Sequence, residues 1–135
     1  MSKEYKKYQI KENHIKKPTL QKITTLLIKK LQKNINGIKK FNFRTSINIQ
    51  ENDKNKLIII DFKEGNVSES KEIDQKVNLM IEIKSSKIRN LLLKKYPMNF
   101  LTFHNGGYTV KREVMRLTKN EKKYWDWINN LDFFI

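Results

Sequence analysis

The chain of 135 residues contains no cysteine, which excludes disulfide bonds, thiolate zinc sites and cysteine nucleophiles. Long apolar runs are also missing, since none approaches the roughly 18 residues that a helix needs to cross a bilayer. The polar stretch at the start of the chain lacks the apolar segment of a signal peptide. These absences predict a soluble protein in a reducing compartment, and we expect it to be cytoplasmic.

Alanine is absent too, whereas lysine, isoleucine and asparagine are abundant, and the net charge is +15. Such a charge usually favours nucleic acid or an anionic membrane as a partner. The codons of these three residues are AT-rich, however, so a biased genome would raise the lysine content without any partner. The basic residues gather in residues 1–45 and 86–135, and either solvated helix faces or an anion-docking surface would explain them.

The length predicts a single domain. Residues 1–16 are interpreted as a flexible basic arm and residues 17–135 as the domain. Pro18 suits the first turn of a helix, where its missing N–H costs nothing. Apolar residues then recur at helical spacing, and Gly37 is placed where a left-handed residue would end the helix. The members of this stripe are Leu20, Ile23, Leu27, Leu31, Ile35 and Ile38.

The period then changes to two, which is typical of strands. Residues 41–50 alternate between apolar and polar, "ENDKN" has turn composition, and "KLIIIDFK" predicts a central strand buried on both faces. Asp61 in that strand either faces the wet side of the sheet or is buried and paired with a lysine. A polar loop follows, with a short pairing segment at Val67, and residues 77–83 alternate again.

A second helix is expected from Ser85 or Ser86, either of which could cap it, to Pro97. "YTVKREV" predicts another strand, and a last helix begins at Thr118. This order predicts an α+β domain with an antiparallel (mixed) sheet of about five strands, covered on one face by helices.

No motif in the sequence indicates catalysis. The Gly106-Gly107 pair lacks the Lys-Ser/Thr of a phosphate loop and precedes a strand, so it is interpreted as a structural bend. His14 and His104 lie far apart with no metal-ligand spacing around them. Asp61 has no second carboxylate at a fixed offset. We therefore predict no catalytic residue, no metal and no cofactor, and a protein that is not an enzyme.

The segment "VNLMIEIKSSKIRNLLLKKYPMNFLTFHNGGYTVKREVMRL" resembles the sterol carrier protein 2 (SCP2) family. The resemblance covers somewhat over half of the chain. Residues 77–83 match a strand and residues 86–95 a helix of that family. The further matches are the post-helix proline (Pro97), the aromatic step (Phe100 and Phe103) and the glycine that opens the last strand (Gly106). The second glycine of the family pattern is replaced near Arg112, and the family's peroxisomal tripeptide is missing.

The resemblance implies an SCP2-like fold and a non-enzymatic protein that binds or transfers lipid in a tunnel between sheet and helices. A lipid or other apolar ligand is then the expected partner, and the lysines would favour an anionic membrane surface as well. The last helix, with Phe133 and Phe134, is either an ordinary core helix or a lid that touches cargo or membrane. The residues expected to line the tunnel are Leu27, Leu31, Ile47, Ile59, Ile81, Leu92, Phe100, Phe103, Trp125 and Ile128.

Two other functions stay open at the level of sequence. The basic arm and the first helix could serve a nucleic-acid-binding accessory protein, although no strand carries the interleaved aromatics of a single-strand reader. The fold could also serve protein contacts, as an accessory factor in lipid or quinone biosynthesis.

Overall fold

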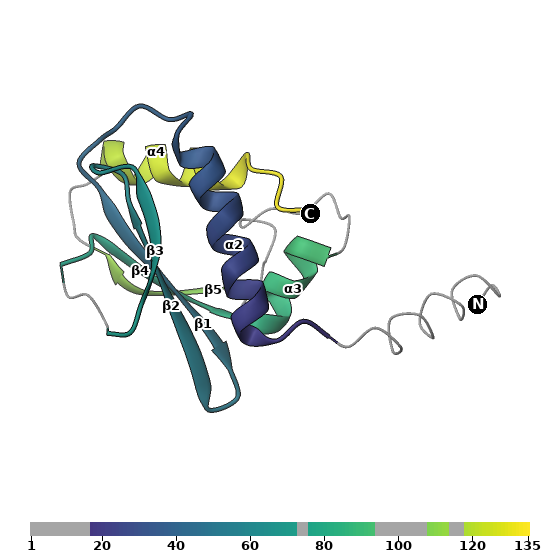
Figure 1. The fold of residues 1–135 in the computed structure, drawn as a ribbon. Helices are drawn as coiled ribbons and strands as arrows, with labels where there is room; N and C mark the ends of the chain where they lie inside the picture. Colours follow the sequence, from purple (N-terminus) through teal and green to yellow (C-terminus); the bar gives the residue numbers. More distant parts are fainter. Residues whose placement is uncertain (1–16, 73–75, 94–107, 114–117) are drawn as a thin grey trace, which may run out of the picture.

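The computed structural model describes residues 17–72, 76–93, 108–113 and 118–135, and in these ranges it confirms the α+β class (Figure 1). The helices are α2 (Leu20–Ile35), α3 (Ser85–Leu93) and α4 (Thr118–Asn129). The strands are β1 (Arg44–Glu51), β2 (Lys54–Asp61), β3 (Asn66–Ser70), β4 (Leu79–Lys84) and β5 (Tyr108–Glu113). The basic arm predicted for residues 1–16 lies outside the described residues, as do Gly106, Gly107 and both histidines.

Helix α2 begins at Leu20, two residues after Pro18. Thr19 is its N-cap, and the Thr19 hydroxyl accepts a hydrogen bond from the backbone N–H of Lys22 at 3.1 Å. Pro18 therefore precedes the cap instead of standing in the first turn. The predicted apolar stripe is confirmed from Leu20 to Ile35, since those members are buried, whereas Ile38 lies beyond the helix end and is only half-buried.

The end of α2 differs from the prediction for Gly37. The C-cap is Asn36 in a right-handed conformation, and Gly37 has no positive φ. The helix ends instead with the N–H of Gly37 donating to the carbonyl of Asn34 at 3.2 Å. The left-handed positions lie in the turns on either side of β2, at Asn52 with φ of 55° and Gly65 with φ of 75°.

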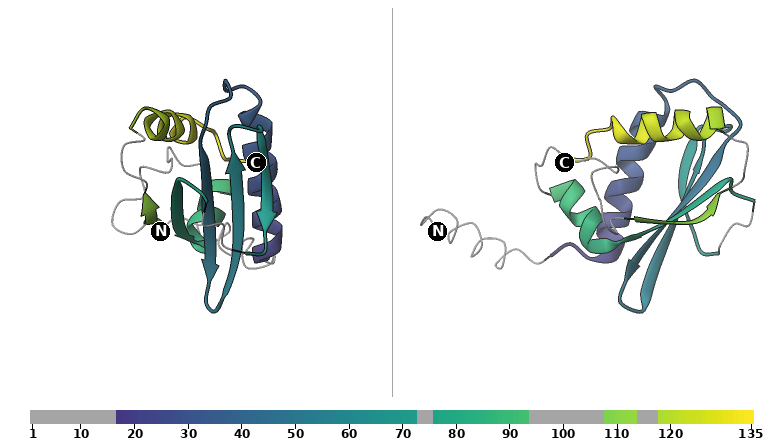
Figure 2. Two further views of the ribbon diagram at one scale, coloured as in Figure 1. Left: turned by 90° about the vertical axis from the view of Figure 1, so that its left-hand side faces the viewer. Right: turned by 180° about the vertical axis from the view of Figure 1, so that it is seen from behind.

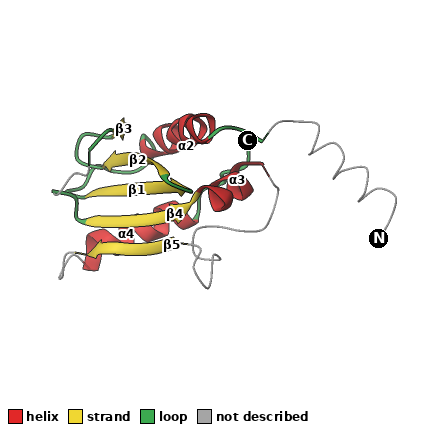
Figure 3. Cartoon of the chain, turned by 90° about the horizontal axis from the view of Figure 1, so that it is seen from below, coloured by secondary structure: helices red, strands yellow, loops and turns green. Residues whose placement is uncertain are grey.

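The five strands form one mixed sheet in the order β3-β2-β1-β4-β5 (Figure 3). Neighbouring strands pair antiparallel except β1 and β4, which are parallel. The pairing segment expected at Val67 is thus a full edge strand, β3. In the middle of the sheet Ile47 lies opposite Ile58 on one side and Ile81 on the other.

The three helices lie on one side of this sheet, as predicted (Figures 1 and 3). The side chains of alternate strand residues point to that side and join α2, α3 and α4 in one buried cluster. We call this side the inner face. On the outer face Leu57, Ile59 and Ser46 are also buried, with 4%, 4% and 1% of their surface exposed, but they do not belong to that cluster. The prediction that β2 is buried on both faces is therefore confirmed.

Asp61 lies on the outer, wetter face, which was one of its two predicted placements. Its carboxylate accepts the backbone N–H groups of Lys63 and Glu64 at 3.0 Å each, and lies 4.0 Å from Arg44. The carboxylate therefore shapes the turn after β2.

Candidate apolar ligand site

The inner face of the sheet and the helices above it enclose a continuous apolar region. Six of the ten residues predicted to line a tunnel meet there, and they come from five helices and strands. Each of the six exposes at most 1% of its surface. They are Leu27 and Leu31 of α2, Ile47 of β1, Ile81 of β4, Leu92 of α3 and Ile128 of α4. Trp125 is half-buried against the same cluster, and its indole N–H donates to Glu121 at 3.2 Å.

Ile59 has to be removed from the predicted lining. Ile58 and Ile60 belong to the inner cluster, and because side chains alternate along a strand, Ile59 points to the outer face. The run of three isoleucines hid this alternation in the sequence. Phe100 and Phe103, the remaining predicted lining residues, lie outside the described part of the chain.

An aromatic cluster closes one end of the apolar region, and the predicted lining missed it. Phe43 lies just before β1 and Phe62 just after β2, and both side chains point to the inner face of the sheet. Their rings contact Tyr124 of α4 at centroid distances of 5.6 and 5.8 Å. Trp127 meets Phe62 edge to face at 5.0 Å, and its indole N–H donates to the carbonyl of Asn34. The period-two spacing of the phenylalanines was the signal that could have revealed them.

The last residues of the chain cover the helical side (Figure 2). Phe133 is buried in the cluster with 3% of its surface exposed. Beyond it, Lys30 Nζ donates to the carbonyl of Phe134 at 2.8 Å, and the N–H of Ile135 donates to the carbonyl of Leu92 at 3.1 Å. The tail thereby joins α2 to the end of α3 over the apolar region.

A polar network fixes the opposite end of α2 and α3. Arg89 of α3 forms an ion pair with Glu51 at the end of β1 and donates to the carbonyl of Pro18 at 3.0 Å. Ser85, one of the two serines expected to cap α3, instead donates its hydroxyl hydrogen to Glu51 at 2.9 Å and accepts from Arg89 at 3.2 Å. The hydrogen bond from Arg89 lowers the pKa of Glu51 below its ordinary value, against the opposing effect of burial.

Beside this network lies a pocket of about 620 Å³ between the start of α2 and the β1–β2 hairpin. It is lined by Thr19, Leu20, Gln21, Glu51, Lys54, Asn55 and Lys56. None of the predicted tunnel residues lines it, although its lining residue Leu20 also belongs to the inner cluster.

The described residues offer no group of three or more His, Asp or Glu side chains that could hold a metal ion. None of the helices in the same ranges is long and apolar enough to cross a membrane.

The sequence matches no protein-family model and no curated protein sequence. Solved structures do match. The palmitated SCP2L2 protein of Aedes aegypti aligns with a TM-score of 0.57 at 12% identity, over 79% of this chain and 95% of that one. The crystal structure of sterol carrier protein 2 like 2 (SCP2-L2) from the same organism gives 0.57 at 10% identity, over 80% and 98%. Its sterol carrier protein 2 like 3 (SCP2-L3) gives 0.55 at 13% identity, over 78% and 98%.

The chain has the sterol carrier protein 2 fold. The match spans nearly the whole length of each similar chain, so the likeness concerns the complete fold and not a shared sheet motif. In this sterol carrier fold the mixed sheet and its one-sided helical cover place the largest apolar surface inside, between two layers.

Proposed function

We propose that the protein binds or transfers a lipid or similar apolar molecule, without changing it chemically, in a tunnel between the inner face of the sheet and the helices. The observation that carries the proposal is the inner cluster itself. Sheet and helices face each other there with long aliphatic and aromatic side chains drawn from seven elements. The similar palmitated structure supports an acyl chain as the class of ligand.

The binding energy would come from apolar contact. Each methylene that leaves water for this region contributes roughly 0.8 kcal/mol. Entry of a chain requires the helical layer to move outward from the sheet, because Leu27, Leu31 and Leu92 are fully buried against it. The C-terminal tail is the natural part to yield first, since beyond the Phe133 side chain it is held by the two hydrogen bonds to Lys30 and Leu92.

Native mass spectrometry of gently purified protein, followed by thermal unfolding of the delipidated protein with palmitate, tests the proposal. We expect co-purifying apolar ligand, and a higher unfolding temperature as palmitate is added. A ligand that binds only the folded state stabilises it by about 2.7 kcal/mol when present at 100 times its Kd. If delipidated protein binds no fluorescent fatty acid and its unfolding temperature does not respond to palmitate, the proposal fails.

Two buried isoleucines on opposite faces of the sheet provide a matched pair of variants. Ile81→Ala and Ile59→Ala remove the same atoms from buried positions, and each should cost about 2–5 kcal/mol of unfolding free energy. Ile81 belongs to the inner cluster and Ile59 does not. We therefore expect Ile81→Ala to change the affinity for a fluorescent fatty acid and Ile59→Ala to leave it unchanged. Equal affinities in the two variants would place the ligand elsewhere.

A further inference from the structure

Three large apolar side chains are exposed together on the helical side of the molecule. Phe134 and Ile135 of the tail expose 39% and 50% of their surface, and Leu93 at the end of α3 exposes 39%. They are neighbours because the N–H of Ile135 donates to Leu92, the residue before Leu93. We call these three residues the apolar tip.

The backbone beneath the apolar tip is already hydrogen-bonded. The N–H of Phe134 donates to the Asp132 carboxylate at 3.0 Å, its carbonyl accepts from Lys30, and the N–H of Ile135 is bonded to Leu92. A segment can enter a medium of low polarity only if such groups have partners, since each unpaired one costs free energy. These three backbone groups of the tail can therefore leave water without losing their hydrogen bonds.

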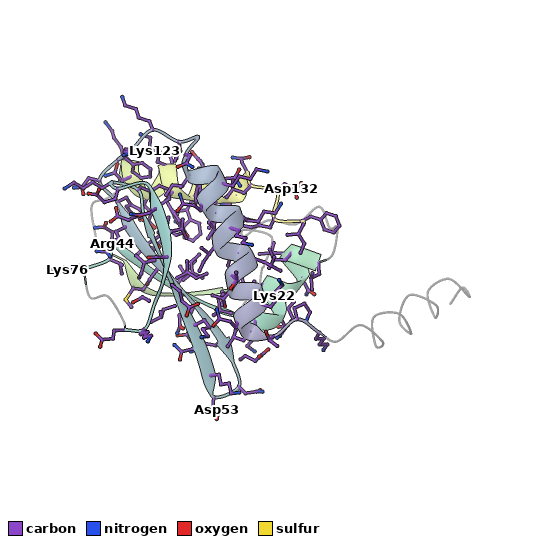
Figure 4. The ribbon with its side chains drawn as sticks, viewed as in Figure 1. Lys22, Arg44, Asp53, Lys76, Lys123 and Asp132 are labelled. Carbon is purple, nitrogen blue, oxygen red and sulfur yellow. The ribbon has the colours of Figure 1, made fainter. Side chains whose placement is uncertain are left out.

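Positive charge borders the apolar tip. Lys30 holds the tail, and Lys33 follows it by three residues on the same side of α2. Lys22 lies eight residues before Lys30, towards the start of the helix. Lys22 and Lys33 are exposed, and Lys22 is visible on α2 in Figure 4. The whole chain carries a net charge of +15. This charge disfavours a second copy of the protein as the partner of the tip, because like charges repel, and it favours an anionic surface.

We infer that the apolar tip and the lysines of α2 beside it dock onto an anionic lipid bilayer, with Phe134, Ile135 and Leu93 entering the interface. Apolar side chains that enter the headgroup region and flanking lysines that stay at its surface are the two contributions that hold peripheral proteins on membranes. This docking surface goes beyond the proposed cargo site, although it includes the tail that would yield when cargo enters.

The absence of cysteine permits a direct test on the full chain. Phe134→Cys and Asp53→Cys would each be labelled with an environment-sensitive fluorophore and mixed with phosphatidylcholine vesicles that contain phosphatidylserine. Asp53 is the matched control, because it lies on the turn of the β1–β2 hairpin, far from Asp132 of the tail in Figure 4. We expect a blue shift of the emission at position 134 and none at position 53.

Vesicle sedimentation separates the apolar contribution from the charge. F134S/I135S should weaken binding by roughly tenfold or more, because it removes the inserted side chains. Lys22→Gln with Lys33→Gln should weaken it about fivefold per lysine on anionic vesicles. Lys39→Gln with Lys40→Gln, in the loop after α2, removes the same charge away from the tip and should have a smaller effect.

Three outcomes would overturn the inference: equal blue shifts at positions 134 and 53, equal binding to vesicles with and without phosphatidylserine, or unchanged sedimentation of F134S/I135S. A shift at position 134 that grows with protein concentration and needs no vesicles would assign the tip to a second copy or to another protein instead. The fluorescent fatty acid assay reports separately on the proposed cargo. Loss of vesicle binding with intact fatty acid binding therefore affects only this inference.

Discussion

At the scale of single residues, neighbouring positions in β1 differ sharply in how their buried hydroxyl groups are satisfied. Thr45 Oγ1 donates to the carbonyl of Leu79 at 3.0 Å on the inner face. Ser46 Oγ is buried on the outer face and has no hydrogen-bond partner among the described residues. An unsatisfied buried hydroxyl costs about 1–3 kcal/mol, whereas a satisfied one contributes about 1 kcal/mol.

Ser46→Ala should therefore raise the free energy of unfolding by about 1 kcal/mol, because it removes the unpaired hydroxyl. Thr45→Val should lower it by a similar amount, because it leaves the Leu79 carbonyl without that donor. Urea denaturation of both variants measures the difference. If Ser46→Ala is destabilised as much as Thr45→Val, the Ser46 hydroxyl has a partner in solution.

The carboxylate of Glu51 gives the stability a defined dependence on pH. Arg89, with a smaller contribution from Ser85, lowers its folded-state pKa below the ordinary value of 4.5. Below that ordinary value the unfolded chain binds more protons than the folded one, so this stabilisation is present above pH 4.5 and is lost as the pH falls through the folded pKa.

Glu51→Gln should consequently flatten the fall in the free energy of unfolding between about pH 5 and pH 3. The variant should be less stable than the native sequence at neutral pH and should approach it in acid. Asp53→Asn, which removes the same charge outside the Arg89 network, is the control. Parallel pH profiles for the native protein and Glu51→Gln would contradict this role.

At the scale of elements, α2 depends on its first turn. No acidic residue stands there to favour the helix dipole, so the cap formed by the Thr19 hydroxyl is the main local stabilisation of that end. Arg89 holds the preceding carbonyl of Pro18, which fixes the direction in which the chain enters the helix.

Thr19→Ala should therefore cost about 1 kcal/mol of stability, as is usual for the loss of a threonine cap. Thr25→Ala is the matched control, since Thr25 lies within the same helix and its hydroxyl bonds only to other groups of the first turns of α2. Alanine has the higher helix propensity there, so this variant should be neutral or slightly stabilised. Thermal unfolding and helical circular dichroism compare the two, and equal losses would argue against the cap.

At the scale of the whole molecule, the charge works against the compact state. With +15 on 135 residues, the folded protein concentrates like charges that the unfolded chain would spread out. Raising the salt concentration from about 10 mM to about 100 mM shortens the screening length from about 30 Å to about 10 Å.

We expect the unfolding temperature to rise over this range of sodium chloride, and the rise to shrink as the pH approaches the sequence pI of 9.9. Differential scanning calorimetry at matched ionic strengths measures both effects. An unfolding temperature that falls with added salt would mean that ion pairs such as Lys56–Glu69 outweigh the repulsion.

The sequence by itself determined the local structure and the sorting of side chains. Stripes at helical spacing fixed α2, and the alternation in β1 and β4 fixed which residues face the core, because these periods are properties of the backbone and act within a few residues. In the unbroken run Ile58–Ile60 there is no alternation to read, and there the sequence misplaced Ile59.

Only the tertiary structure decided which distant segments meet. Four contacts join residues that are far apart in the chain. They are the parallel pairing of β1 with β4, the pairing of Val67 in the edge strand β3, the Glu51–Arg89 ion pair, and the hydrogen bonds of the tail to Lys30 and Leu92. Such contacts form only when the intervening chain closes into loops and the sheet packs against the helices, so no local sequence pattern specifies them. The apolar tip is likewise a product of the tertiary structure, since it brings Leu93 of α3 next to Phe134 and Ile135 of the tail.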